Sequence, residues 1–352
     1  MELNVIIVGA SGYSGLELIR ILLQHPKVTI THLFAGHQEY DTVIQLFPHL
    51  RSFLDLPIET LEQLTDQKIK ELKQEAEFVF LATPSGVSSH WGPKFFNHGF
   101  QVIDLSGDFR LKDVKVYEEW YQKKGPDVEI VKHAVYGLAE VFPDEIKDAN
   151  YIANPGCYTT SILLALAPLY KRKVPIQSVI IDAKSGVSGA GRGLSIAAHY
   201  SEVNENLKAY KVGKHQHIPE VEQILSQLSE RNIVVQMITH LIPMTRGILS
   251  TIYLDIEEEI ELSQVFQFYR EDYEQQPFIR LLPQGSYPET KQVCGTNFCD
   301  ISIFYDERTK KLVLFSAIDN LVKGAAGQAV QNLNLMMRWD QTLGLKQIPI
   351  YP

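Results

Sequence analysis

The stretch LNVIIVGASGYSG, residues 3–15, decides the fold class of this chain. Its first six residues are mostly apolar and β-branched, which is typical of a strand in a parallel sheet buried on both faces. Three glycines follow with the spacing G-x-x-G-x-x-G, and residues 16–24 are predicted to form a helix. A strand, a glycine turn and a helix in this order predict the first unit of a Rossmann-type, doubly wound sheet.

Further along the chain, short apolar strands are predicted at residues 28–34, 78–82 and 101–105, each followed by a turn. Beyond Pro155 the predicted strands are longer and several are separated by turns, which favours an α+β domain with a mixed sheet. They span residues 178–183, 233–242, 249–255, 300–305 and 311–317.

Two helices are predicted in the second half, one beginning at Pro219 and one over residues 321–338. The second of these is expected to return to the first domain. We therefore predict a dinucleotide-binding domain of residues 1–154 with 319–352, and a catalytic and oligomerisation domain of residues 155–318. Residues 36–57 have no clear periodicity.

Composition excludes several classes of protein. The net charge of −9 argues against a nucleic-acid partner, and no apolar run approaches the roughly 18 residues of a membrane span. Three cysteines do not suggest a secreted disulfide framework, so a cytoplasmic location is expected. Cys294 and Cys299 lack a second pair of ligands at zinc spacing, so we interpret both as structural and expect no metal.

The glycine turn predicts a dinucleotide site. Glycine allows the backbone to approach a pyrophosphate, and the following helix offers N–H donors and the positive end of its dipole. A second loop, after the strand at 78–82, is expected at the same sheet edge. The segment 33–37 after the second strand lacks an acid for the ribose of NAD, which favours NADP. The candidate cofactor residues are Gly9, Ser11, Gly12, Tyr13, Ser14, Gly15, Thr83, Pro84, Ser85 and Gly86.

Cys157 stands where a helix is predicted to begin, after the turn Asn154-Pro155-Gly156. A thiol at a helix N-terminus has a lowered pKa, and thiolate is the reactive form. The same N–H groups are able to stabilise an oxyanion. Cys157 is therefore the candidate nucleophile, and Asn154 is a candidate substrate contact. The alternative is a buried structural cysteine, as most free cysteines are.

Two further segments predict anion binding and acid–base chemistry. Residues 184–193 combine glycines, serines and cations, which suits a phosphate or carboxylate cradle of N–H groups and hydroxyls. A strand at 233–242 leads to Arg246, a second guanidinium. His215 and His217 precede the helix at Pro219, and histidine is the usual acid–base group near neutral pH. The candidate residues of the cradle are Ser185, Gly186, Ser188 and Arg192.

Taken together, the motifs resemble the N-acetyl-γ-glutamyl-phosphate reductases, relatives of aspartate-semialdehyde dehydrogenase. The matching segments follow the family's order along nearly the whole chain. They are GASGYSG (9–15), DLSGDFRL (104–111), VYGLAE (135–140), NPGCYTT (154–160), SGVSGAGR (185–192), GKHQHIPE (213–220), HLIPMTRGIL (240–249) and DNLVKGAAGQAVQN (319–332).

The resemblance implies an oxidoreductase of arginine biosynthesis that uses NADPH to convert N-acetylglutamyl 5-phosphate, a small acyl phosphate, into the semialdehyde and phosphate through a cysteine thioester. It implies Cys157 as nucleophile, His217 rather than His215 as acid–base group, and Arg192 and Arg246 at the substrate's anionic groups. Asn320 and Lys323 fall in the segment that returns to the nicotinamide.

Two departures from the family pattern stand out: Thr159 replaces a usual proline, and Phe34-Ala35 replace a frequent Ser-Arg pair. Two alternative functions stay open. One is the same chemistry on another acyl phosphate, aspartyl or modified aminoadipyl phosphate. The other is a non-catalytic NADP-binding redox sensor that uses Cys157. A homodimer or homotetramer is expected, since long strands of the second domain suit pairing between subunits.

Overall fold

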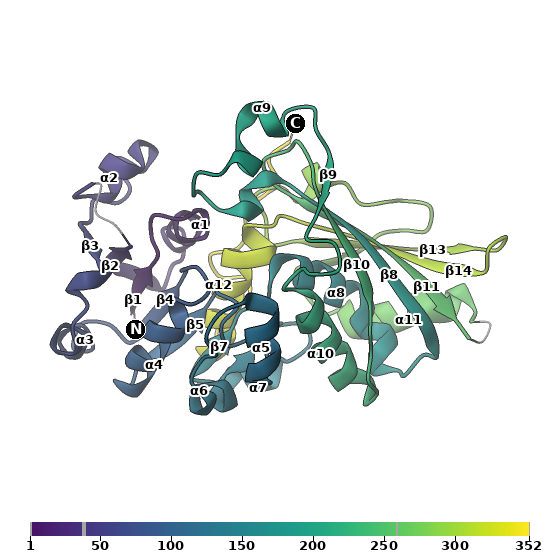
Figure 1. Ribbon diagram of the computed structural model, residues 1–352, viewed down its shortest axis with the longest axis horizontal. Coiled ribbons are helices and arrows are strands. Elements are labelled where there is room, and N and C mark those ends of the chain that lie inside the picture. Colours follow the sequence, from purple (N-terminus) through teal and green to yellow (C-terminus); the bar gives the residue numbers. More distant parts are fainter. Residues whose placement is uncertain (1, 37–39, 258–259, 352) are drawn as a thin grey trace. The chain divides into compact units, whose positions relative to one another are not determined.

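The computed structural model describes residues 2–36, 40–257 and 260–351, which form two compact units (Figure 1). Unit 1 comprises Met1–Pro155 and Ala325–Lys346, and unit 2 comprises Gly156–Gly324 and Gln347–Pro352. The ends differ from the predicted domains, because residues 319–324 and 347–352 belong to unit 2. There the Asp319 carboxylate accepts the N–H of Gly295 at 2.7 Å, and the N–H of Ile350 donates to the Cys294 carbonyl at 3.2 Å.

Unit 1 contains a seven-stranded, wholly parallel sheet in the order β3-β2-β1-β4-β5-β7-β6. This confirms the doubly wound sheet predicted from the glycine-turn segment. All four residues of β4 are buried, as expected for a strand covered on both faces. The strands are β1 (Leu3–Val8), β2 (Val28–Ala35), β3 (Ile58–Thr60), β4 (Phe78–Leu81), β5 (Gln101–Asp104), β6 (Val135–Tyr136) and β7 (Tyr151–Ala153).

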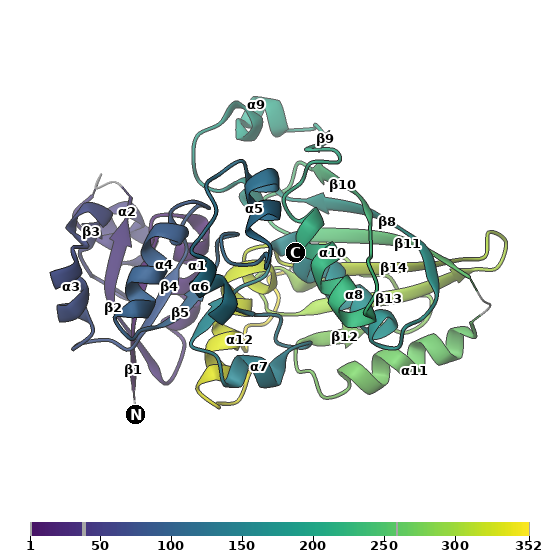
Figure 2. The same ribbon diagram turned by 60° about the horizontal axis from the view of Figure 1, so that its bottom comes forward.

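Alternating strand residues of unit 1 face different helices. Ile6 and Val8 of β1 belong to the core cluster that also contains Phe95 of α4 and Leu72 of α3. In Figure 2, α3 and α4 lie in front of the strands, and α12 contacts α1 and α7. The helices are α1 (Tyr13–Leu22), α2 (Val43–Leu46), η1 (Pro48–Leu50), η2 (Leu61–Gln63), α3 (Asp66–Leu72), α4 (Ser88–Asn97), α5 (Val114–Tyr121), α6 (Val128–His133), α7 (Pro143–Lys147) and α12 (Gly327–Met336).

Unit 2 contains a mixed seven-stranded sheet in the order β12-β13-β14-β11-β8-β10-β9, which confirms the predicted α+β class. The four central neighbours β13, β14, β11 and β8 are antiparallel, whereas β10 runs parallel to β8. The strands are β8 (Ile176–Ser185), β9 (Lys208–Tyr210), β10 (Gln236–Leu241), β11 (Ile248–Ile256), β12 (Ile279–Leu281), β13 (Cys299–Asp306) and β14 (Lys311–Ile318).

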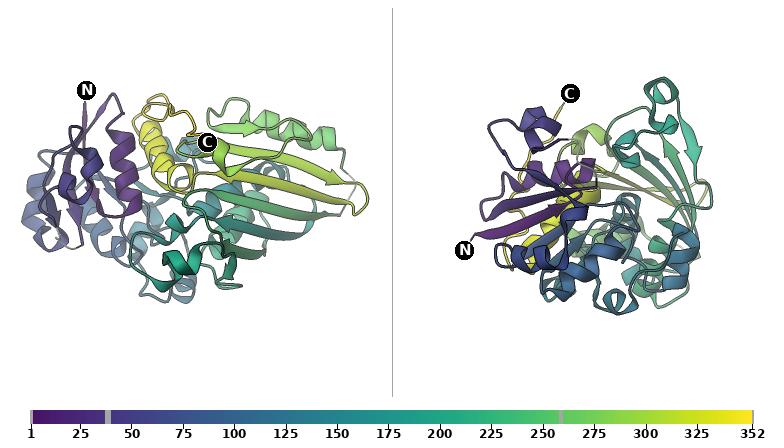
Figure 3. Two further views of the ribbon diagram at one scale, coloured as in Figure 1. Left: turned by 90° about the horizontal axis from the view of Figure 1, so that it is seen from above. Right: turned by 60° about the vertical axis from the view of Figure 1, so that its left-hand side comes forward.

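Helix α8 covers one face of this sheet, in contact with β11, β14 and the helices α10 and α11. The left view of Figure 3 looks onto the other face, where strands lie uncovered over much of their length. On that face Phe304, Val313, Tyr253 and Ile180 form one row across four strands, and Phe304, Tyr253 and Ile180 are exposed. The helices are α8 (Cys157–Lys171), η3 (Val187–Ala190), η4 (Ile196–Ala198), α9 (Tyr200–Val203), α10 (Ile218–Ser229), α11 (Leu262–Tyr273) and η5 (Thr290–Val293).

The helix predicted over residues 321–338 is not continuous. A π-helical turn, η6 (Val322–Ala326), precedes α12, which spans only Gly327–Met336. Apolar composition does not distinguish a π turn from an α-helix, so the prediction joined the two elements. π-helical turns are often found at functional sites, and this one contains Lys323.

Candidate active site

Cys157 is the first residue of α8, and Gly156 before it is extended, with φ −68° and ψ 151°. The thiol-bearing residue is partly exposed, whereas every residue from Tyr158 to Tyr170 is buried. The apolar helix thus fixes the position of its own N-terminus, where the dipole is positive and favours a thiolate. The structure places Cys157 at the helix start, as the sequence predicts. Thr159 lies in the same first turn, where a proline and a threonine are both tolerated.

The His217 imidazole lies directly against the backbone before Cys157. A Cβ on Gly156 would come within 2.4 Å of His217 Nε2, so only glycine leaves room for this ring. His217 is buried and immediately precedes α10, which contacts α8. Packing of the two helices therefore brings the imidazole to the start of α8.

Glu220 fixes the same junction from the first turn of α10. Its Oε1 accepts the Gly156 N–H at 2.8 Å, and its side chain is fully buried. A carboxylate in the first turn of a helix is also stabilised by the helix dipole. The Gly156 N–H is therefore not available to an oxyanion, which leaves that function to the N–H groups of α8 itself.

His215 plays a different part from His217. Its Nδ1 accepts the His217 N–H at 3.2 Å, and the two ring centroids are 4.7 Å apart. Burial, followed by the charges of His217 and Lys211, lowers the pKa of His215 to about 2. The ring stacks edge-on with Tyr158 and Tyr210. His215 is therefore neutral across the physiological range and orients the segment that carries His217.

The π turn closes the site on the other side of Cys157. A Cβ on Gly324 would lie 2.8 Å from Cys157 Cβ, so this backbone passes directly over the nucleophile. Lys323 is fully buried, with its Nζ 5.8 Å from the centroid of the Phe278 ring. Asn320 donates to Ser188 Oγ at 2.9 Å and accepts the Gly247 N–H at 2.8 Å. The Asn320 amide thus ties two loops of unit 2 together.

In the segment predicted to bind an anion, several backbone N–H groups donate to carbonyls of the neighbouring loop of residues 244–247. The N–H groups of Gly186, Val187 and Ser188 donate to the carbonyls of Gly247, Met244 and Thr245 at 2.9–3.1 Å. These three N–H groups are therefore not available to an anion, a pairing with a neighbouring loop that local composition does not reveal. The Ser185 hydroxyl is also buried and donates to the Gly186 carbonyl at 3.1 Å.

The two arginines of this region differ in placement. Arg246 Nη1 lies 3.4 Å from Asp319 Oδ2, and the arginine side chain is 29% exposed. Asp319 is fully buried and also accepts the N–H groups of Gly295, Leu321 and Val322. The buried Asp319 carboxylate therefore positions the Arg246 guanidinium, part of which stays accessible to solvent. Arg192 lies past η3 on an exposed segment.

The cofactor loops both lie in unit 1 and touch each other. Gly9 has φ +94°, and a Cβ there would lie 2.3 Å from the Ala82 carbonyl oxygen. A Cβ on Gly15 would lie 2.3 Å from Gly9 O. Gly12 caps α1, and among the described residues, its chain neighbours and the backbone of α1 aside, only Gly9 O, at 3.6 Å, lies within 4 Å of its Cβ position. The cradle therefore fits a phosphate at the N-terminus of α1. Helix α1 begins at Tyr13, three residues before the predicted start.

Phe34 and Ala35 are both buried at the end of β2. The Phe34 carbonyl accepts the N–H groups of Gly9 and Ala10 at 2.8 and 2.9 Å, so this position braces the glycine turn. His37, the last residue of the 33–37 segment, lies outside the described residues.

Asn154, predicted as a substrate contact, is a structural residue of unit 1. It is fully buried, its Nδ2 donates to the Ala325 carbonyl at 3.1 Å, and its Oδ1 accepts from Asn332 at 3.0 Å. Its carbonyl accepts from Arg110 at 2.7 Å. Each end of the amide therefore has a partner within the protein. The substrate contact predicted for Asn154 stays a prediction.

The described residues contain no group of three or more metal-ligating side chains, and none of the helices in the described ranges is long and apolar enough to cross a membrane. Cys299 is buried with Sγ 3.4 Å from Ser316 Oγ.

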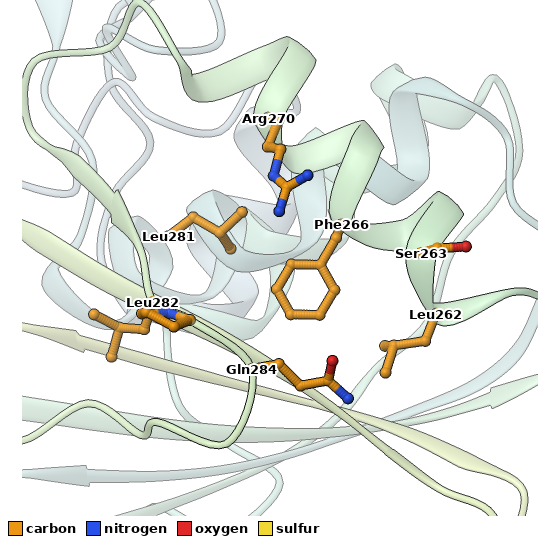
Figure 4. A pocket seen from close by; sticks show the side chains of 8 residues that line it. Leu262, Ser263, Phe266, Arg270, Leu281, Leu282 and Gln284 are labelled. Carbon is orange, nitrogen blue, oxygen red and sulfur yellow. The ribbon is translucent and has the colours of Figure 1, made fainter.

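A hollow of about 630 Å³ lies between α11 and the loop after β12, where Phe266 and Arg270 face Leu281 (Figure 4). Its lining includes none of the predicted site residues.

Comparison with known proteins defines the class. Residues 4–149 match the semialdehyde dehydrogenase NAD-binding domain, and residues 157–320 match the semialdehyde dehydrogenase dimerisation domain. The structure resembles aspartate semialdehyde dehydrogenase II of Vibrio cholerae complexed with ASA, with TM-score 0.73, 20% identity, and 96% and 99% of the two chains covered. It also resembles the Candida albicans aspartate semialdehyde dehydrogenase with NADP, with TM-score 0.70, 15% identity and the same coverage. The class is therefore the semialdehyde dehydrogenases, with a nicotinamide dinucleotide as cofactor.

Sequence comparison then resolves the family within this class. The chain is 49% identical over 351 residues to the N-acetyl-gamma-glutamyl-phosphate reductase of Geobacillus kaustophilus (strain HTA426), covering 99% of this chain and 100% of the relative. The reductase of Bacillus cereus (strain B4264) is 47% identical over 350 residues with the same coverage. The chain belongs to the N-acetyl-γ-glutamyl-phosphate reductase family, which confirms the resemblance. The dimerisation-domain match indicates an oligomer.

Three site features were missed by sequence reasoning: the Glu220 bond to Gly156, the Asp319 support of Arg246, and the passage of Gly324 over Cys157. Only the first had a signal in the sequence, an acid in the first turn of a helix that follows the histidines. The other two arise from segments far apart in the chain.

Proposed function

We propose that this chain reduces N-acetyl-L-glutamyl 5-phosphate to N-acetyl-L-glutamate 5-semialdehyde and phosphate, with NADPH as reductant, in arginine biosynthesis. The observation that carries the proposal is the His217 ring seated on Gly156, immediately before Cys157 at the start of α8, in a chain of this reductase family. A thiol, an imidazole and a helix N-terminus at one point suit acyl transfer.

Cys157 acts as the nucleophile. Its thiolate attacks the carbonyl carbon of the acyl phosphate, the carbon–oxygen bond to phosphate breaks, and a thioester on Sγ remains. The α8 N-terminus stabilises the thiolate beforehand and the oxyanion during the attack. When bound, the nicotinamide cofactor supplies the hydride that reduces the thioester carbonyl.

His217 acts as the acid–base group. The imidazole protonates the oxyanion formed by hydride addition, and removes that proton when the thiohemiacetal breaks down to aldehyde and thiolate. His215 supports this step without titrating, because its lowered pKa keeps it neutral and its Nδ1 holds the His217 backbone.

The cofactor is held by unit 1. The cradle of Gly9, Gly12 and Gly15 at the start of α1 would hold its phosphates, with Ser11, Tyr13 and Ser14 in the same turn. The loop of residues 83–86 lies beside it at the carboxyl edge of the sheet. In unit 2, Lys323 adjoins the backbone that covers Cys157, and Asn320 orders the loops around it.

Substrate anions are bound by side chains rather than backbone N–H groups. Arg246, supported by Asp319, offers its guanidinium to a carboxylate. Arg192 and the Ser188 hydroxyl are the remaining donors of the 185–192 segment. Glu220 is buried on the Gly156 N–H, and so is unavailable to a substrate ammonium. A substrate whose nitrogen is acetylated, and therefore neutral, suits such a site better than aspartyl phosphate.

The reaction run backwards tests this assignment. With NADP and phosphate, we expect N-acetylglutamate semialdehyde to be oxidised at least a hundredfold better than aspartate semialdehyde, as kcat/KM, because an unpaired buried ammonium costs about 3 kcal/mol or more. The measurement is NADPH absorbance in steady state. Preference for aspartate semialdehyde would favour the sister activity, and no turnover of either aldehyde would favour the redox sensor.

A preference for NADPH over NADH is expected, because residues 33–36, at the end of β2, include no carboxylate that could accept a hydrogen bond from a ribose hydroxyl. The buried Phe34 and Ala35 offer no cation either, so we expect a moderate ratio of kcat/KM, about tenfold. Kinetics with both cofactors at one phosphate concentration measure it. Equal or better use of NADH would contradict the assignment.

The subunits associate as a homodimer or homotetramer through the open face of the unit 2 sheet. Its exposed row of Phe304, Tyr253 and Ile180 is apolar and flanked by the Asp182–Lys184 ion pair, at 2.8 Å. Such a face suits a self-complementary contact. None of the three cysteines, all of which lie in the described residues, forms a disulfide, which suits a reducing cytoplasm.

A further inference from the structure

The DLSGDFRL segment has no part in the chemistry described so far, yet it places two buried carboxyl groups in unit 1. Asp104 is the last residue of β5, and Asp108 lies in the loop that follows. Both side chains are fully buried. Burying a carboxylate is costly unless hydrogen bonds stabilise it, so the partners of each group indicate what it does.

Asp108 caps helix α4 from a separate loop. Its carboxylate accepts the Gly86 N–H at 2.8 Å, the Ser89 N–H at 2.7 Å and the Tyr117 hydroxyl at 2.7 Å. The N-cap residue of α4, Val87, provides no side-chain cap. A negative group on the first N–H groups of a helix also meets the positive end of its dipole.

The same contacts fix the cofactor loop of residues 83–86, which leads into α4. The Gly107 N–H donates to Ser85 Oγ at 3.3 Å, and Lys123 Nζ donates to the Ser85 carbonyl. Thr83 and Ser88 share a hydrogen bond of 2.8 Å. Gly86 has φ +87°, a conformation that favours glycine and places its N–H on Asp108. The loop therefore takes its shape largely from the segment around Asp108.

Asp104 lies in the same cluster, because the Ser106 hydroxyl donates to Asp104 Oδ2 and accepts the Asp108 N–H, both at 3.1 Å. Its carboxyl group accepts the Ser106 N–H at 2.7 Å and contacts the hydroxyls of Ser106 and Tyr151 at 3.1 and 3.4 Å. The titratable groups that face it are Asp108, Tyr151 and Tyr117. Burial, followed by the negative charge of Asp108, raises the pKa of Asp104 to about 7.

We propose that Asp108 is a positioning residue that holds the loop of residues 83–86 in its cofactor-binding shape, and that Asp104, which shares its buried cluster through Ser106, makes the shape of this loop depend on pH. The proposal rests on the proposed function only in assigning the cofactor to that loop. As pH rises through about 7, Asp104 ionises beside Asp108, two like charges share one buried site, and the loop's hydrogen bonds to Asp108 weaken.

NADPH binding without substrate tests the proposal. Asp108→Asn should weaken binding about tenfold, as loss of charge-assisted hydrogen bonds implies. The dissociation constant is measured by the change in NADPH fluorescence on titration with protein. The matched control is Asp127→Asn, which alters the exposed cap of α6, where the aspartate accepts the Glu129 N–H at 2.9 Å. The control should bind like the wild type.

The pH dependence gives a second readout that a merely structural role would not move. Between pH 6 and 8.5, NADPH affinity of the wild type should fall several-fold, and Asp104→Asn should remove this dependence. The free energy of unfolding should change in the same direction as the affinity. Because the pKa of Asp104 is raised, the folded state binds an extra proton between about pH 4 and 7. The wild type should therefore lose stability relative to Asp104→Asn as the pH rises through that interval.

The outcomes separate the two proposals. If the wild type does not bind NADPH, the proposed function fails. If it binds, but Asp108→Asn binds equally well and Asp104→Asn retains the wild-type pH dependence, the inference about this loop is overturned. Should Asp108→Asn fail to fold, the pH dependence of Asp104→Asn decides alone.

Discussion

Replacing Cys157 with serine is expected to reduce turnover by at least about 10³-fold, because an alkoxide at this position is not available near neutral pH and no other thiol takes its place. The fold should be unaffected, since serine is nearly isosteric and residue 157 is partly exposed at the start of α8. Steady-state rates of semialdehyde oxidation, with thermal unfolding alongside, measure both effects.

The matched control is Cys294→Ser, which also changes a partly exposed cysteine of unit 2 that is not in a disulfide. It should retain activity within about twofold, because surface substitutions away from special features have small effects. Loss of activity in Cys294→Ser together with survival of Cys157→Ser would move the nucleophile to the other cysteine.

Replacing His217 with asparagine is expected to lower kcat about 10²- to 10³-fold, the usual contribution of a positioned acid–base group. The pH profile of kcat should lose its limb near neutrality, while KM changes little. His217 is assigned as the acid–base group because its ring lies against Gly156, the residue before Cys157. A Cβ on Gly156 would be only 2.4 Å from His217 Nε2. The pH–rate profile from pH 5.5 to 9 is the measurement.

His215→Asn is the comparison for this prediction. The lowered pKa of His215 keeps it neutral over the whole profile, so the variant should retain the limb and show a smaller loss of activity. The loss that remains would come from the hydrogen bond that His215 Nδ1 accepts from the His217 N–H. A limb that disappears in His215→Asn and persists in His217→Asn would exchange the two roles.

Local patterns were sufficient where local chemistry determines the structure. The apolar run and glycine turn of residues 3–15 predicted β1, the start of α1 to within three residues, and the parallel sheet. The apolar helix after Cys157 was also predicted from its run of apolar residues, and in the structure every residue from Tyr158 to Tyr170 is buried. The resemblance of motifs then identified the family that the comparisons confirm.

The errors have a common physical origin in partners that are distant in sequence. Glycines and serines at 185–192 predicted open N–H donors, but the 244–247 segment uses three of them. The bonds of the Asn154 amide to Asn332 and to the Ala325 carbonyl were likewise not visible in the sequence. The two histidines could not be told apart from their own residues, and only the family resemblance favoured His217, the ring that lies on Gly156 in the structure.

The acyl-enzyme on Cys157 is the intermediate through which the proposed reduction passes, so its detection decides whether the proposed mechanism holds. The enzyme is mixed with N-acetylglutamyl phosphate in the absence of NADPH, quenched in acid and analysed by peptide mass spectrometry. We predict an N-acetylglutamyl adduct on the peptide that carries Cys157, absent from Cys157→Ser and discharged as aldehyde when NADPH is added before quenching. An adduct on Cys294 or Cys299, or turnover with no adduct on Cys157 at any time, would contradict the account.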